Sequence, residues 1–215
     1  MAEKRVLMVE GLDDEHVVKH ICGQRNLGEI EFIHKYGSKD QLLEGIGPRL
    51  KESDIFALGI LLDADTDLLA SWQAVSDRLR YAGYASVPSD PEPIGTVIPP
   101  PTDSLLPRVG VWLMPDNRVP GILEDFLRFL VPDGDPLFNH VEQSLDAIPS
   151  AQRRFNNLRK PKAAIHTWLA WQEEPGKPYG QAISARYLDP HLPAANHFAV
   201  WLSRTFFPPE GPALP

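Results

Sequence analysis

The sequence predicts an α/β fold, with a mostly parallel sheet flanked by helices and a helical C-terminal extension. Short apolar runs alternate with helical patterns along the first part of the chain, which favours parallel strands joined by crossover helices. Two of these runs end in acidic residues, and ligands of parallel sheets bind at the carboxyl ends of strands. After about residue 133 the pattern becomes mostly helical.

Three strands and three helices are predicted in alternation before residue 85. Each expected strand is a short apolar run: KRVLMVE (4–10), EIEFIHKY (29–36) and DIFALGILLD (54–63). Helices are expected after each of them. Ser38 with Gln41 forms a capping box for the second helix, Asp67 caps the third, and Gly83 ends it.

Further elements follow a proline-rich segment. Residues 88–107 contain seven prolines and predict an extended loop or hairpin, with GTVI (95–98) as an edge strand. RVGVWLM (108–114) is another expected buried strand, and helices are expected in PGILEDFLRFL (120–130), KAAIHTWLAWQ (162–172) and AANHFAVWLSRTF (194–206). At helical spacing, Trp168, Trp171, Trp201 and His166 are expected to be packed in the core. The expected organisation is a core over 1–132, a helical extension packed on it over 133–207, and a flexible tail over 208–215.

Composition excludes several classes of protein. The chain has 215 residues, 43% hydrophobic and 23% charged, without an apolar run long enough for a membrane span. One cysteine, Cys22, cannot form an intrachain disulfide, so a cytoplasmic protein without a membrane partner is expected. The net charge of −8 argues against a protein whose whole surface is positively charged for binding nucleic acid. Positive charge is local to RRFNNLRKPK (153–162), where the candidate nucleic-acid contacts are Arg153, Arg154, Arg159 and Lys160; a solvated helix face is the alternative.

In the stretch GILLDADTD (59–67), the apolar run of an expected strand is followed directly by three aspartates. Asp63 and Asp65 can aim into one pocket from the strand end, while Asp67 suffices to cap the next helix. Glu10 ends the first strand, and acidic residues begin the helix after it. Carboxylates gathered in this way repel one another unless a cation lies between them. Mg²⁺ or Mn²⁺ is the expected ligand, because hard cations take oxygen donors.

These motifs resemble the Toprim domain of topoisomerases, bacterial primases and the overcoming-lysogenization-defect nucleases. VEGLDDEHVV (9–18) supplies the glutamate and glycine after the first strand, and LLDADTD (61–67) supplies the DxD after the third. Asp14 is similar to the acid that those nucleases carry on the first helix, and Glu124 to their later helix acid. The resemblance covers roughly residues 4–130. The chain looks closer still to an uncharacterised prokaryotic family of stand-alone Toprim-like proteins, through WLMPDN, EDFL and HTWLAWQEEPGKPYGQAI.

The resemblance implies divalent-metal-dependent phosphodiester hydrolysis, that is, a nuclease acting on DNA or RNA. Two cations would be held by Glu10, Asp14, Asp63, Asp65 and Glu124, with Glu10 counted among the catalytic residues. The related nucleases also use a lysine, for which Lys162 and Lys177 are candidates and Lys160 a weaker one. The alternative is a catalytically silent subunit that binds metal, nucleic acid or a partner protein. Many Toprim nucleases work beside an ATPase, and GxxxxGK[ST] does not occur in the sequence, so a separate ATPase is a possible partner.

Three other classes of protein carry similar motifs but match this sequence less well. A haloacid-dehalogenase-like phosphatase needs Thr or Val four residues after its first aspartate, where this chain has Asp67. A response-regulator receiver has acids directly after its first strand, where this chain has Gly11 and Leu12. A zinc hydrolase of the HExxH type needs a glutamate after the first histidine, and Val17 follows His16.

Overall fold

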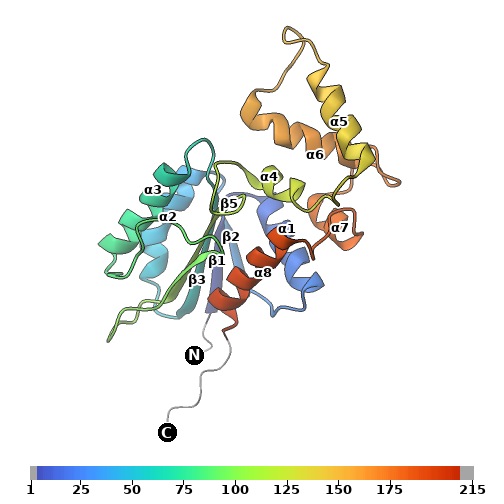
Figure 1. The fold of residues 1–215 in the computed structure, drawn as a ribbon. Helices are drawn as coiled ribbons and strands as arrows, with labels where there is room; N and C mark the ends of the chain where they lie inside the picture. Colours follow the sequence, from blue (N-terminus) through green and yellow to red (C-terminus); the bar gives the residue numbers. More distant parts are fainter. Residues whose placement is uncertain (1–3, 209–215) are drawn as a thin grey trace.

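Five strands form one sheet in the computed structural model, which describes residues 4–208. The strands lie in the order β2-β1-β3-β5-β4 (Figure 1). β1 (Lys4–Val9), β2 (Phe32–Lys35), β3 (Ile55–Asp63) and β5 (Arg108–Met114) are parallel, and β4 (Thr96–Ile98) is an antiparallel edge strand beside β5. The predicted α/β class, its mostly parallel sheet and the edge strand are confirmed.

Helices connect the strands and make up the C-terminal region. They are α1 (Leu12–Gln24), α2 (Lys39–Leu50), α3 (Leu68–Tyr81), α4 (Leu123–Arg128), α5 (Pro136–Asp146), α6 (Lys160–Ala170), α7 (Tyr179–Ser184) and α8 (Pro193–Phe206), with a 3₁₀ turn η1 (Asn157–Arg159) before α6. None of the helices within residues 4–208 has both the length and the apolar character needed to cross a bilayer. Of the tail expected over 208–215, residues 209–215 lie outside the described residues.

Local capping chemistry sets where the helices near the sheet edge begin. Ser38 Oγ accepts a hydrogen bond from the Gln41 backbone N at 3.3 Å, and Asp67 Oδ1 accepts one from Ala70 N at 2.9 Å. Gly83 follows α3 with φ of 110°, a conformation that favours glycine. The predicted caps and the predicted end of α3 are therefore confirmed.

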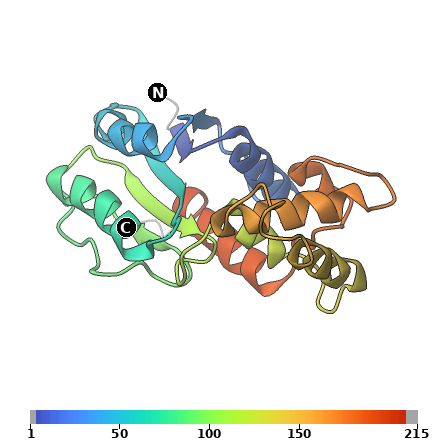
Figure 2. The same ribbon diagram turned by 90° about the horizontal axis from the view of Figure 1, so that it is seen from above.

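Helices cover both faces of the sheet. α2 and α3 pack against one face, where Leu42, Ile46, Trp72 and Val75 are buried with alternate residues of β1, β3 and β5. α1 and α8 cover the other face, so the sheet is the middle layer of three (Figure 2). Strands buried on both faces read as nearly continuous apolar runs, as β3 and β5 do.

Two glycines let α8 lie close to the sheet. Gly59 and Gly110 face each other in the register of β3 and β5. A Cβ on Gly59 would come within 2.4 Å of the Phe206 ring, and one on Gly110 within 2.1 Å of Thr205 Oγ1. The last helix of the chain thus completes the main hydrophobic core against strands that come much earlier in the sequence.

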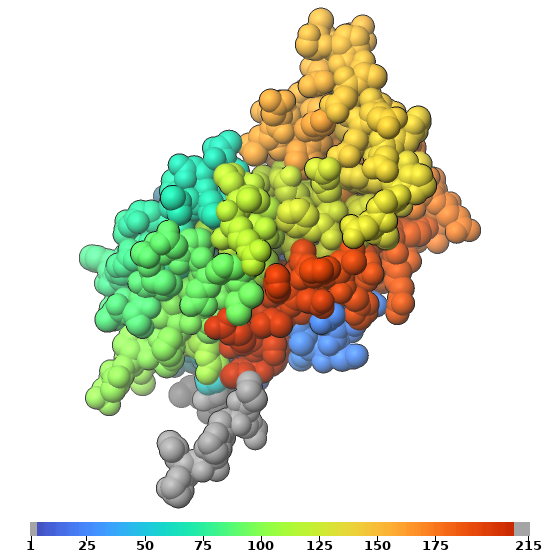
Figure 3. Space-filling view, in the orientation of Figure 1, coloured from blue at the N-terminus to red at the C-terminus, as the bar shows by residue number. Residues whose placement is uncertain are grey.

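α5 and α6 form a lobe on the side of the molecule where the parallel strands end, above α4 (Figures 1 and 3). Trp168 of α6 is buried against Phe138 of α5, and Trp201 of α8 is buried in the core, as expected. The expectation is wrong for Trp171, which is 43% exposed because α6 ends at this position, and for the exposed His166.

Candidate functional site

The carboxyl ends of β1 and β3 bring two of the predicted acids together. Glu10 directly follows β1, and Asp63 is the last residue of β3. The two strands are neighbours, and Glu10 Oε1 accepts a hydrogen bond from the Asp63 backbone N at 2.9 Å. The sheet itself therefore positions this pair, as the rule for parallel strand ends predicts.

Helix starts supply two further acids. Asp14, in the first turn of α1, accepts a hydrogen bond from Gly11 N at 2.8 Å and is 9% exposed. Glu124, in the first turn of α4, is 3% exposed. Asp63 Oδ1 accepts from Leu123 N at 2.9 Å, which ties the end of β3 to the start of α4. Helix N-termini favour negative side chains, so both positions suit an acid.

Burial and the charges of neighbouring carboxyls raise the pKa values of Glu10, Asp14 and Asp63. For Asp63, burial is the largest cause of a strongly raised pKa, followed by the charges of Glu10, Asp14, Asp65 and Glu124. Burial, with the charges of Glu10 and Glu124, raises the pKa of Asp14 to about 7. Asp63 therefore lies close enough to each of the other four predicted acids for their charges to act on it.

The five acids do not form a ready-made coordination sphere. Within residues 4–208, no three side chains of His, Cys, Asp or Glu converge on one point at which a metal ion could be held. Backbone N–H groups and lysines hold the carboxylates instead. The donor set still suits Mg²⁺ or Mn²⁺, because it consists of carboxylate oxygens, the donors that hard cations prefer.

Two lysines each pair with one of the acids. Lys39 Nζ lies 2.8 Å from Asp65 Oδ2, and Lys162 Nζ lies 2.6 Å from Glu124 Oε1. Tyr179 Oη donates to the same Glu124 oxygen at 3.1 Å and lies 2.8 Å from His166 Nε2. Lys162, a predicted catalytic residue, thus lies at the site.

The other predicted basic residues lie farther along the C-terminal region. Lys177 pairs with Glu174 at 2.6 Å in the segment before α7. The expected nucleic-acid contacts lie between α5 and the start of α6: Lys160 pairs with Asp146, Arg153 lies over the Phe155 ring, and Arg154 and Arg159 are exposed. This segment leads directly into α6, which carries Lys162. α6 lies on the side of the molecule where the parallel strands end (Figure 1).

Sequence reasoning did not identify three residues of this site, Lys39, Tyr179 and His166. Lys39 had a detectable signal, because it follows the helix cap Ser38 just beyond the carboxyl end of β2. A lysine in the first turn of a helix is unfavourable to the helix dipole, which makes a compensating contact expected. Tyr179 gave no such signal, since its partner Glu124 is 55 residues away.

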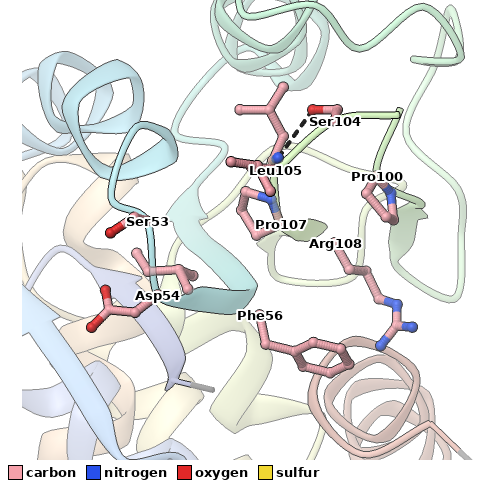
Figure 4. Close-up of a pocket in the computed structure, with 10 residues that line it drawn as sticks. Ser53, Asp54, Phe56, Pro100, Ser104, Leu105, Pro107 and Arg108 are labelled. Atoms are coloured by element: carbon pink, nitrogen blue, oxygen red, sulfur yellow. Dashed lines mark hydrogen bonds between the residues drawn. The ribbon is translucent and has the colours of Figure 1, made fainter. Parts of the chain in front are cut away.

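A separate cavity of about 290 Å³ lies at the opposite end of the strands. Its lining includes Ile55, the first residue of β3, and Arg108, the first residue of β5. Figure 4 shows Arg108 beside Phe56 in this cavity. The Arg108 guanidinium lies over the Phe56 ring at 5.2 Å. None of the five acids lines this cavity. The acids therefore form a distinct site at the carboxyl edge of the sheet.

Residues 4–207 match the family described as "Protein of unknown function (DUF3226)". The chain belongs to this family. The match spans the sheet, the acidic residues at its edge and the α5–α8 region of this chain together. No curated protein and no solved structure matches the chain.

Proposed function

We propose that this protein hydrolyses phosphodiester bonds of DNA or RNA with the help of Mg²⁺ or Mn²⁺. The observation that carries the proposal is the gathering of five carboxylates at one edge of a parallel sheet, with the pKa values of Glu10, Asp14 and Asp63 all raised. A raised pKa of a carboxyl means that its negative form is unfavourable where it lies. A bound proton or a bound cation relieves the repulsion between neighbouring carboxylates. A cytoplasmic location belongs to the same proposal.

Each side chain has a part in this chemistry. The residues that would hold the cations are Glu10, Asp14, Asp63, Asp65 and Glu124, and the chemistry that bound cations would supply is activation of a water molecule and stabilisation of the leaving oxygen. Lys162 keeps 39% of its side chain exposed, so its ammonium can turn from Glu124 towards a phosphate. The exposed Arg154 and Arg159 would contact the nucleic-acid backbone beside it.

The test is cleavage of plasmid DNA and of a labelled RNA with Mg²⁺, Mn²⁺ or EDTA. Asp63→Asn and Glu10→Gln are expected to abolish cleavage, because each removes a charged oxygen donor with little change of shape. Asp67→Ser is the matched control from the same DADTD motif. Its side chain caps α3 through Ala70 N, and serine retains that function, so cleavage should persist.

A catalytically silent binding subunit is the second candidate. It is favoured by the internal donors that hold each carboxylate and by the lack of a shared metal-binding point within the described residues. Mn²⁺ binding that Asp63→Asn abolishes, without cleavage by the wild type alone or with an added ATPase partner, would select this alternative. Cleavage that survives both Asp63→Asn and Glu10→Gln would contradict the proposed site.

A further inference from the structure

Lys39 occupies an unusual place for a cationic residue. It is the first residue of α2, where the helix dipole disfavours positive charge. Its ammonium donates hydrogen bonds to Asp65 Oδ2 at 2.8 Å, to the Asp63 carbonyl oxygen at 2.8 Å and to Ser71 Oγ at 2.7 Å. These three bonds use all three ammonium protons, and the side chain is only 22% exposed. The contacts compensate for the unfavourable helix position.

Two of these three oxygen acceptors belong to the DxD motif. Oxygen donors from a carboxylate and a backbone carbonyl are the groups that a hard divalent cation also takes. The Asp63 carboxylate faces elsewhere, since its Oδ1 accepts from Leu123 N. The two aspartates of the motif therefore do not meet at one cation in this arrangement, and Lys39 neutralises Asp65.

The other four carboxylates of the site differ in whether a cationic side chain pairs with them. Glu124 is neutralised by Lys162, as Asp65 is by Lys39. Among the described residues, Glu10, Asp14 and Asp63 form no ion pair, and each accepts a hydrogen bond from a backbone N–H. These three carboxyls have no cationic side chain paired with them, so the negative charge that they carry when deprotonated is what attracts a first divalent cation.

We propose that Lys39 is a resident cation of the site: its ammonium holds the position beside Asp65, so a second divalent ion binds only when Lys39 moves away. The inference rests on the proposed function for the nature of the metal. It goes further by assigning the order in which two cations bind and the residue that controls the second. An ammonium and a divalent ion at the same carboxylate repel each other, which gives the control its physical basis.

The test is titration of the full chain with Mn²⁺. Binding is measured by calorimetry and by the electron paramagnetic resonance signal of the free Mn²⁺. The wild type is expected to bind one ion tightly and a second at least about tenfold more weakly. Lys39→Met is expected to strengthen the second binding by at least about tenfold, because it removes the competing charge. Lys39→Gln, which keeps a donor for Asp65, should strengthen the second binding by a similar factor. It is the variant to measure if Lys39→Met folds poorly.

Lys51→Met is the matched control, since Lys51 is an exposed residue at the other end of α2. It should bind both ions as the wild type does. Two equally tight sites in the wild type, or a second site that neither Lys39 variant strengthens, would overturn the inference and leave the proposed function intact. Absence of Mn²⁺ binding to every variant would overturn both.

Discussion

Asp14→Asn removes one negative charge from the buried acids with little change of shape. The asparagine Oδ1 can still accept the hydrogen bond from Gly11 N, so the cap of α1 is retained. What changes is the cost of holding a carboxylate at a site that is 9% exposed and close to Glu10 and Glu124. The substitution therefore isolates the electrostatic cost of Asp14.

The size of the effect follows from the pKa of Asp14. Its pKa is about 7 in the folded protein, against a usual value of 3.8. In the unfolded chain the carboxyl loses its proton above about pH 3.8, whereas in the fold it keeps the proton until about pH 7. Folding stability is therefore unaffected by Asp14 at lower pH and falls as the pH rises through this window. The full cost corresponds to about 4 kcal/mol, and we expect about 2 to 4 kcal/mol because the neighbouring carboxyls also adjust.

The assay is urea unfolding of wild type and Asp14→Asn in EDTA at about pH 4 and about pH 8. The variant should have nearly the wild-type free energy of unfolding at the lower pH and a clearly larger one at the higher pH. Added Mn²⁺ should narrow the difference, because a ligand of the folded state stabilises the wild type more. Asp13→Asn is the matched control, since Asp13 is the exposed neighbour in the same helix turn; its charge is only a lesser cause of the raised pKa of Asp14, so a much smaller gain is expected. A variant that is no more stable than the wild type at about pH 8 would refute the reasoning.

Three further predictions concern the packing around the site and the core. Tyr179→Phe removes a buried donor from Glu124 and should lower the free energy of unfolding by about 1 to 3 kcal/mol in urea titrations; wild-type stability would show that the bond contributes nothing. Gly110→Ala should cost about 1 to 3 kcal/mol, since its Cβ would meet Thr205, and Thr205→Ala in the same chain should recover part of the loss; additive losses would contradict this contact. Cys22 is buried with a pKa of about 11, so at neutral pH it should react with iodoacetamide at least about 100-fold more slowly than in the urea-unfolded chain; equal rates would show an accessible thiol.

Local signals were sufficient for much of the fold. Short apolar runs located the strands and a period of about 3.6 residues located the long helices, while Ser38 and Asp67 fixed two helix starts because capping acts within one turn. The position of Glu10 and Asp63 after neighbouring parallel strands was enough to predict that the two lie together. The nuclease activity and the metal ions stay predictions.

The sequence by itself determined the order of strands and helices and the edge of the sheet at which the acids gather, because both depend on short-range patterns. Only the tertiary structure decided which charges partner those acids. Lys39 reaches Asp65 across 26 positions, and Lys162 reaches Glu124 across 38. The tertiary structure also decided that α8 lies on Gly59 and Gly110. Such contacts join segments far apart in the chain, and their energies depend on distance in space, which no local pattern of residues contains.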